Sequence, residues 1–163
     1  MSVTDELLAG AAQYAARFDR GDLPLPPARR VAVVACMDAR LDPQALLGLD
    51  LGDAHVIRNA GGAVTDDVVR SLAISQRLLG TREIVRVHHT DCGMLTFTDD
   101  EFRQAVEADT GIRPPWAAEA FADLEADVRQ SVARVVASPF IPHRDAVRGF
   151  VYDVSTGALA EVR

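Results

Sequence analysis

The fold is decided by the stretch Val31-Ala-Val-Val-Ala-Cys36-Met-Asp38-Ala-Arg40, near the start of the chain. Five apolar residues run directly into a cysteine, and an aspartate and an arginine then follow at alternate positions. A short apolar run rich in valine, with polar residues beyond it, predicts a buried β-strand. We therefore expect this strand to carry a thiol, a carboxylate and a guanidinium at its C-terminal end.

A second stretch of the same design is Glu83-Ile-Val-Arg-Val-His88-His89-Thr-Asp-Cys92-Gly93. It predicts another buried strand, which ends in histidine and is followed by a cysteine. Strand patterns alternate with helical patterns along the chain, which is typical of a mostly parallel sheet with helices on its faces. Functional sites in such sheets gather at the C-terminal ends of the strands. We therefore expect the two stretches to meet at one edge of the sheet.

The predicted fold is a single α/β domain over residues 1–163. It has a mostly parallel central sheet of four strands, a short antiparallel edge strand and flanking helices. Strands are predicted at about 30–36, 54–58, 83–88 and 149–154, with the edge strand at 158–162. Helices are predicted from a Thr4 cap to about Asp19, over 42–48, over 65–80, from a Thr98 capping box onward and over 119–136.

Composition and charge exclude several classes of function. The 163 residues are 48% apolar and 25% charged, the balance of an ordinary globular protein that can bury a core. The net charge of −7 opposes binding to nucleic acid or to an anionic membrane, because both need a basic surface. No apolar run reaches the roughly 20 residues of a membrane span, and the acidic N-terminus lacks the features of a signal peptide. We therefore expect a cytoplasmic protein.

The first helix is followed by a proline-rich linker, Asp22-Leu-Pro-Leu-Pro-Pro27. Proline excludes helix and also restricts the residue before it, so the linker should be extended. The helix has an apolar face that includes Leu7, Leu8 and Phe18, and this face needs a surface to cover it. That surface belongs either to the same domain or to a partner subunit.

The two cysteines of the chain, Cys36 and Cys92, have two interpretations. They are either inert packing residues or thiolate ligands of a metal, since a disulfide is not expected in the cytoplasm. Zinc favours thiolate and imidazole, and Cys36, His89 and Cys92 supply such a set. Three protein ligands leave a fourth position, which is typical of a catalytic zinc site. We interpret the cysteines as ligands because both follow strands that end at the shared edge.

Two details of this site stay open from spacing alone. His88 competes with His89 for the metal, because neighbours on a strand point to opposite faces and periodicity does not choose between them. Asp38 is close enough to Cys36 to fill the fourth position itself or to accept a hydrogen bond from water there. Arg40 is placed to pair with Asp38 as a guanidinium–carboxylate fork.

Together these motifs resemble those of the β-class carbonic anhydrases, in particular the small actinobacterial members. The resemblance extends over most of the chain and rests on Cys36-x-Asp38-x-Arg40, on His89-x-x-Cys92-Gly93 and on Arg58-Asn59-Ala60-Gly61 between them. It implies that Cys36, His89 and Cys92 bind one zinc ion per chain, which selects His89 over His88. From spacing alone, the Arg58–Gly61 segment has two equally good interpretations: it lines the site, or it is a structural turn.

The same resemblance implies reversible hydration of carbon dioxide to bicarbonate and a proton, with zinc lowering the pKa of its bound water. Asp38 and Arg40 would form the catalytic dyad. If Asp38 instead moved onto the zinc, it would be the fourth ligand of a closed form, and the sequence does not choose between the two forms. The resemblance also implies a homodimer, or a tetramer of two such dimers. In this assembly residues 1–28, the N-terminal helix and linker, would pack on the partner subunit.

The sequence departs from the plant-type members of that family. No glutamine precedes the first ligand between Asp22 and Ala35, and His55 and Ile74 stand where those members carry aromatic site residues. The carbon dioxide pocket and the proton exit are therefore not carried over. We expect His55 to be a polar residue at a strand end and His143 to be a surface residue, rather than ligands.

Two other functions fit parts of the pattern. The same zinc chemistry can hydrolyse carbonyl sulfide or carbon disulfide, as some relatives of the family do, and the width and polarity of the pocket would decide. A zinc-stabilised binding module without catalysis is the second alternative. The Asp38–Arg40 pair argues against that module, because a purely structural zinc site would not need it.

Overall fold

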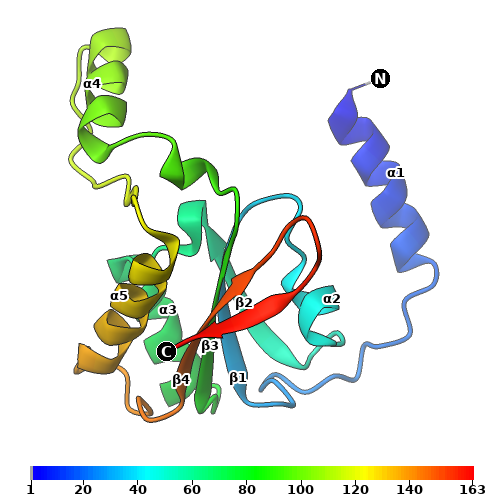
Figure 1. The fold of residues 1–163 in the computed structure, drawn as a ribbon. Helices are drawn as coiled ribbons and strands as arrows, with labels where there is room; N and C mark the ends of the chain where they lie inside the picture. Colours follow the sequence, from blue (N-terminus) through cyan, green and yellow to red (C-terminus); the bar gives the residue numbers. More distant parts are fainter. Residues whose placement is uncertain (1) are drawn as a thin grey trace.

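A five-stranded sheet forms the centre of the described part of the chain, residues 2–163, in a computed structural model (Figure 1). The strands lie in the order β2-β1-β3-β4-β5. Their bounds are β1 Val31–Cys36, β2 Ala54–Asn59, β3 Glu83–His89, β4 Val147–Tyr152 and β5 Leu159–Val162. Strands β2, β1, β3 and β4 are parallel to one another, and β5 pairs antiparallel with β4. The predicted fold class is confirmed.

Helices cover the sheet unevenly. In Figure 1, α3 and α5 lie together on one side of the sheet, and α1 stands away from the body of the molecule. The helices are α1 Val3–Ala15, α2 Pro43–Leu47, α3 Asp66–Arg77, α4 Asp99–Thr110 and α5 Leu124–Ala137, with short 3-10 turns η1 Ala60–Gly62 and η2 Gly93–Leu95. Within residues 2–163, no helix combines the length and the apolar character that a membrane span would need.

Strand β1 is buried on both faces, which explains its uninterrupted apolar run. On one face Val34 packs with Leu72 of α3 and Val135 of α5. On the other face Val33 packs in a second cluster with Val87 of β3 and with the loops beyond the strand ends. The strand is thus held in the middle of the protein, and its C-terminal end has a defined position.

The first helix begins earlier than predicted. Ser2, not Thr4, is its N-cap: the Ser2 hydroxyl accepts the Asp5 N–H at 3.2 Å, and the Asp5 carboxylate accepts the Ser2 N–H at 2.8 Å. This reciprocal capping box fixes the start, which spacing alone placed two residues too late. The helix ends at Ala15, so Phe18 lies in the turn that follows rather than on the helical face.

The last long helix begins later than predicted, at Leu124 rather than Glu119. The Asp99 carboxylate accepts the backbone N–H groups of Ala118, Glu119 and Ala120 at 2.9, 3.3 and 2.8 Å, which holds this segment out of helix. Asp123 then caps α5 by accepting the Ala126 N–H at 2.8 Å. The early start was wrong because the competing acceptor is distant in sequence.

Other boundaries differ by a few residues, which is ordinary for element ends. Helix α3 ends at Arg77 rather than Gly80, β3 extends to His89, and β4 covers Val147–Tyr152 instead of 149–154. The helix starts predicted at Asp42, Thr65 and Thr98 all form, and Thr98 makes the predicted capping box. None of these shifts changes which strand ends meet.

Candidate metal centre

The end of β1 is fixed by a guanidinium clamp. Arg58 of β2 donates to the carbonyl oxygens of Cys36 at 3.0 Å, Asp38 at 2.8 Å and Leu41 at 2.8 Å. Three carbonyls held by one side chain leave the loop after β1 little freedom. Within the Arg58–Gly61 segment, Arg58 therefore has a structural role, which is to hold the loop after β1. A basic residue at the end of the neighbouring strand was the available sequence signal.

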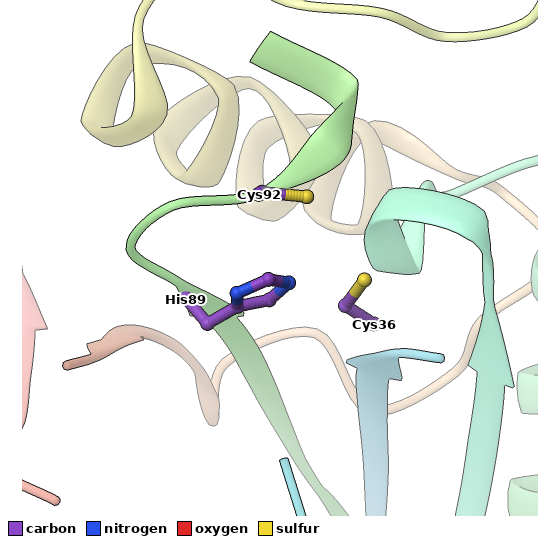
Figure 2. Close-up of side chains that lie close together, drawn as sticks. All are labelled: Cys36, His89 and Cys92. Carbon is purple, nitrogen blue, oxygen red and sulfur yellow. The ribbon is translucent and has the colours of Figure 1, made fainter. Parts of the chain in front are cut away.

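The three predicted metal ligands come together. Cys36 ends β1, His89 ends the adjacent strand β3, and Cys92 lies in the loop beyond β3. Figure 2 shows the three side chains converging from these segments. One ligand atom from each lies within 4.8 Å of the others, and all three residues are buried. Asp91 takes a left-handed φ of 54°, which turns the loop so that Cys92 folds back over His89.

The nitrogen of His89 that faces the cysteines is free to bind a cation. Its Nδ1–H donates to the Thr90 carbonyl at 2.8 Å, which leaves Nε2 as the unprotonated nitrogen. Within residues 2–163 this buried Nε2 has no hydrogen-bond partner. A buried imidazole nitrogen without a partner, beside two thiols, is the donor set that zinc prefers. The site therefore fits the zinc ion that the sequence implies.

His88 points to the other face of the strand, as alternation requires. Its Nε2 lies 3.3 Å from the Asp127 carboxylate of α5, and its Nδ1 accepts the backbone N–H of His89 at 3.0 Å. The ring is fully buried against Phe121, with the ring centroids 4.5 Å apart. His88 therefore holds the backbone of His89 from the opposite face of the strand and is not part of the ligand cluster.

The two thiols do not ionise alike when no cation is bound. The contact with Cys92 lowers the pKa of Cys36, and His89 lowers it further. The same contact and burial raise the pKa of Cys92. Burial lowers the pKa of His89, but its contacts with Cys36 and Thr90 outweigh burial and leave that pKa raised. One thiolate beside one thiol is thus the favoured state, and a metal would displace the remaining proton.

Asp38 and Arg40 form a two-pronged ion pair beside the cluster. Arg40 Nε lies 3.0 Å from Asp38 Oδ1, and Arg40 Nη2 lies 2.8 Å from Asp38 Oδ2. Asp38 Oδ2 is also 3.7 Å from His89 Nε2. The hydrogen bonds from Arg40 hold the pKa of Asp38 well below its usual range. The carboxylate is therefore ionised and faces the ligand atoms from a fixed position.

The contact between Asp91 and Arg40 was not predicted from the sequence. The Asp91 carboxylate lies 2.7 Å from Arg40 Nη1, and the Asp91 carbonyl accepts from Arg40 Nη2 at 3.0 Å. Arg40 thereby joins the loop after β1 to the loop after β3. The only signal was an acidic residue inside the His89–Cys92 motif, and its partner is far away in the sequence.

The remaining histidines lie outside the cluster. His55 Nδ1 is 2.7 Å from the Ser75 hydroxyl of α3, which in turn bonds Thr81. The backbone of His143 exchanges hydrogen bonds with the Gln76 side chain. Among residues 2–163 the group of potential metal ligands comprises Cys36, His89 and Cys92.

An apolar cavity of about 430 Å³ adjoins the site. It lies between turn η1 and the segment that runs from η2 through α4. Its lining includes Asn59, Ala60, Met94, Phe97, Phe102 and Trp116. Met94 lines the cavity and packs in the same cluster as Cys36 and Cys92, so the cavity begins close to the candidate ligands. Small uncharged molecules are the class of ligand that such a lining suits.

Comparisons with known proteins agree with this geometry. Residues 31–159 match the family model described as carbonic anhydrase. The chain is 60% identical over 162 residues to beta-carbonic anhydrase 1 of Mycobacterium tuberculosis, covering 99% of both chains. A crystal structure of carbonic anhydrase from Streptococcus mutans superposes with a TM-score of 0.94 at 46% identity, covering 100% of this chain and 99% of that one. A carbon disulfide hydrolase of Acidithiobacillus thiooxidans is 37% identical, covering 86% of this chain and 80% of the relative.

Proposed function

The chain belongs to the β-carbonic anhydrase family, and we propose that it hydrates carbon dioxide reversibly to bicarbonate at one zinc ion bound by Cys36, His89 and Cys92. One observation carries the proposal: three soft ligand atoms within 4.8 Å of one another lie beside an ionised carboxylate. Two thiolates and a neutral imidazole balance the charge of a zinc ion. They also leave a fourth position for the reaction.

When bound, zinc would lower the pKa of a coordinated water and supply a nucleophile near neutral pH. Asp38 supplies the hydrogen-bond acceptor beside that position. Arg40 holds both oxygens of Asp38, so the carboxylate can accept a hydrogen bond from the attacking water and direct its lone pair at the carbon. This arrangement supports the open form. A closed form with Asp38 as the fourth ligand would require Asp38 to leave Arg40.

The decisive experiment measures carbon dioxide hydration by stopped flow on protein whose zinc content is known. We expect one zinc per chain and turnover at alkaline pH. An Asp38→Asn variant should keep its zinc and lose activity by about 100-fold or more, because the acceptor that orients the nucleophile is lost. A Cys36→Ser variant should lose the zinc itself. A zinc-loaded wild type without hydration activity would show that the proposal is wrong.

Hydrolysis of carbon disulfide is the second candidate function. The 37% identity to a carbon disulfide hydrolase and the apolar cavity beside the site favour it. The same ligand set and the same dyad would serve, because that substrate is also a linear molecule attacked at carbon. Sulfide release should be measured on the same preparation as carbon dioxide hydration. The faster of the two reactions identifies the substrate for which the cavity is shaped.

We propose further that residues 1–163 form one domain whose N-terminal segment, up to residue 28, packs on the partner subunit of a homodimer. Helix α1 carries apolar side chains that remain largely exposed, with Val3, Leu7 and Leu8 at 72, 68 and 63%. Apolar surface of this extent on a helix that stands off the body needs a second copy to cover it. Pairing of two such dimers would give a tetramer.

We also propose a cytoplasmic location, because the two cysteines must stay reduced to bind zinc. Both are free thiols in the structure. Cell fractionation followed by detection of the protein tests this location. Recovery of the protein outside the cytoplasm would contradict the proposal.

A further inference from the structure

A charged network lies behind the proposed metal centre, on the face of β3 opposite the ligands. It consists of Arg86 and His88 of β3 and Asp127 of α5. Arg86 is 1% exposed and His88 is fully buried. A single oxygen of Asp127, Oδ2, lies 3.3 Å both from Arg86 Nη2 and from His88 Nε2. None of these three residues has a part in the chemistry described above.

Burying a guanidinium at this position has a large free-energy cost. Burial lowers the pKa of Arg86 to about 10, although Asp127 opposes the shift. An apolar side chain of similar volume would avoid that cost, and buried ion pairs are often no more stabilising than such replacements. Stability alone therefore gives no reason for the network. The geometry of the network indicates instead that it fixes the position of neighbouring groups.

On one side the network holds the backbone of the histidine ligand. His88 Nδ1 accepts the backbone N–H of His89 at 3.0 Å. Nδ1 can accept only when the ring proton sits on Nε2, and Asp127 Oδ2 is the acidic oxygen that faces Nε2. This contact falls short of hydrogen-bond geometry, so the carboxylate acts through its charge, which favours the tautomer of His88 that supports His89.

On the other side the network holds the turn beneath the first cysteine ligand. Arg86 Nη2 donates to the Gly61 carbonyl at 2.9 Å. A Cβ added at the next residue, Gly62, would lie 2.8 Å from the Cys36 nitrogen and 2.9 Å from Arg86 Nη1. The η1 turn is therefore clamped between Arg86 and the end of β1. Movement of Arg86 would be transmitted directly to Cys36.

We propose that Asp127 is a positioning residue for the metal centre, acting through His88 on the backbone of His89 and through Arg86 on the turn that supports Cys36. The inference rests on the proposed zinc site. Asp127 touches neither the ligand atoms nor the apolar cavity beside them. Its effect should appear in how tightly and in what geometry the metal is held.

The test compares Asp127→Asn with Glu125→Gln, a matched loss of one charge on the same helix. Glu125 is exposed and pairs with Arg129 on the helix surface. Zinc affinity is measured by competition with a chelator, and coordination by the visible spectrum of the cobalt-substituted protein. Asp127→Asn should weaken zinc binding about tenfold to a hundredfold, as loss of an outer partner of a metal ligand does, and should alter the cobalt bands. Glu125→Gln should change neither.

A double variant, Arg86→Leu with Asp127→Asn, separates positioning from folding. Asp127→Asn alone leaves Arg86 as an unpaired buried charge and can unfold the protein, whereas the double variant buries no unpaired charge. We expect the double variant to fold, by circular dichroism, and still to bind zinc at least about tenfold more weakly than the wild type. Wild-type affinity and an unchanged cobalt spectrum in the folded double variant would overturn the inference. Failure of the wild type to bind zinc would instead refute the proposed function.

Discussion

At the scale of single residues, Arg40 is the point where the two motifs of the site are joined. Its guanidinium spans four acceptors: both carboxylate oxygens of Asp38, and the carboxylate and the backbone carbonyl of Asp91. A planar fork can serve two carboxylates in fixed directions, which the single ammonium of lysine cannot do. The orientation of Asp38 toward the proposed metal thus depends on the shape of Arg40 as well as on its charge.

We predict that Arg40→Lys lowers kcat/KM for carbon dioxide hydration by at least about tenfold while zinc content stays at the wild-type level, because two-pronged recognition is lost. Stopped-flow assays on metal-quantified protein provide the measurement. Asp91→Asn is the comparison variant. The Asp91 side chain is 79% exposed, and an exposed ion pair contributes at most about 1 kcal/mol, so its loss should cost less than about fivefold. Equal losses in the two variants would contradict this account.

At the scale of elements, α4 shows how a local sequence signal defines a helix start. Thr98 accepts the Glu101 N–H at 3.3 Å, and the Glu101 carboxylate accepts the Thr98 N–H at 2.8 Å. The donors from Thr98 lower the pKa of Glu101. The folded pKa therefore lies below the unfolded value, so the stability from this box is fully present above the unfolded pKa. It is lost as pH falls through the folded pKa.

We predict that Thr98→Ala raises the pKa of Glu101 toward its ordinary value of 4.5, because the hydroxyl donor is removed. The measurement is an NMR titration of the Glu101 side-chain carboxyl in both proteins. The same titration of Asp5, which sits in the capping box of α1, is the internal control and should not move. A Glu101 pKa that is identical in both proteins would mean that the box does not form in solution.

The contact between α5 and β4 depends on a residue without a side chain. A Cβ at Gly149 would lie 2.4 Å from Val128 Cγ1 and 3.1 Å from Val132 Cγ2. We predict that Gly149→Ala lowers the free energy of unfolding by about 1–3 kcal/mol, the usual cost of overpacking. Urea denaturation measures it.

A second substitution identifies the cause of that loss. Combining Gly149→Ala with Val128→Ala removes the clashing methyl groups, so the double variant should be less destabilised than the sum of its single variants. Strict additivity would exclude a clash with Val128 as the reason.

At the scale of the whole molecule, the exposed apolar face of α1 calls for a second chain. We predict that the wild type has the mass of two chains, or of four, by light scattering after size exclusion. Leu7→Glu with Leu8→Glu should shift the mass toward one chain, because charges replace covered apolar side chains. Gln13→Glu adds a charge on the same helix at a polar position and should leave the mass unchanged. A wild type with the mass of one chain would show that α1 is not an interface.

The proposed zinc ion would tie together two strand ends that are distant in the sequence, so its removal should affect the entire fold. With free zinc at about 100 times its Kd, binding stabilises the native state by about 2.7 kcal/mol. For a chain of this size we predict that a chelator lowers the thermal midpoint by roughly 5 to 10 °C. Differential scanning calorimetry provides the measurement. The Cys36→Ser variant should show no chelator-dependent shift, and an equal shift there would point to zinc bound elsewhere.

The sequence by itself predicted the order of strands and helices along the chain, the class of fold and the candidate ligands. The patterns behind these predictions each lie within a short segment: the apolar run before Cys36, the His89–Cys92 spacing and the cap at Thr98. The alternation of side chains along a strand and the capping of a helix depend on neighbouring residues, so local sequence patterns predict them. The choice of His89 over His88 came only from the family resemblance, since alternation fits either residue.

The tertiary structure alone decided which distant groups complete the site. It turned His88 toward Asp127, brought Asp91 to Arg40 and used Asp99 to keep residues 118–120 out of helix. Each of these contacts joins side chains or backbone groups that are far apart in the sequence. Which atoms meet there depends on how two packed elements are placed, and the energy of that placement is spread over the whole core. The sequence pattern of a single segment therefore cannot predict this placement.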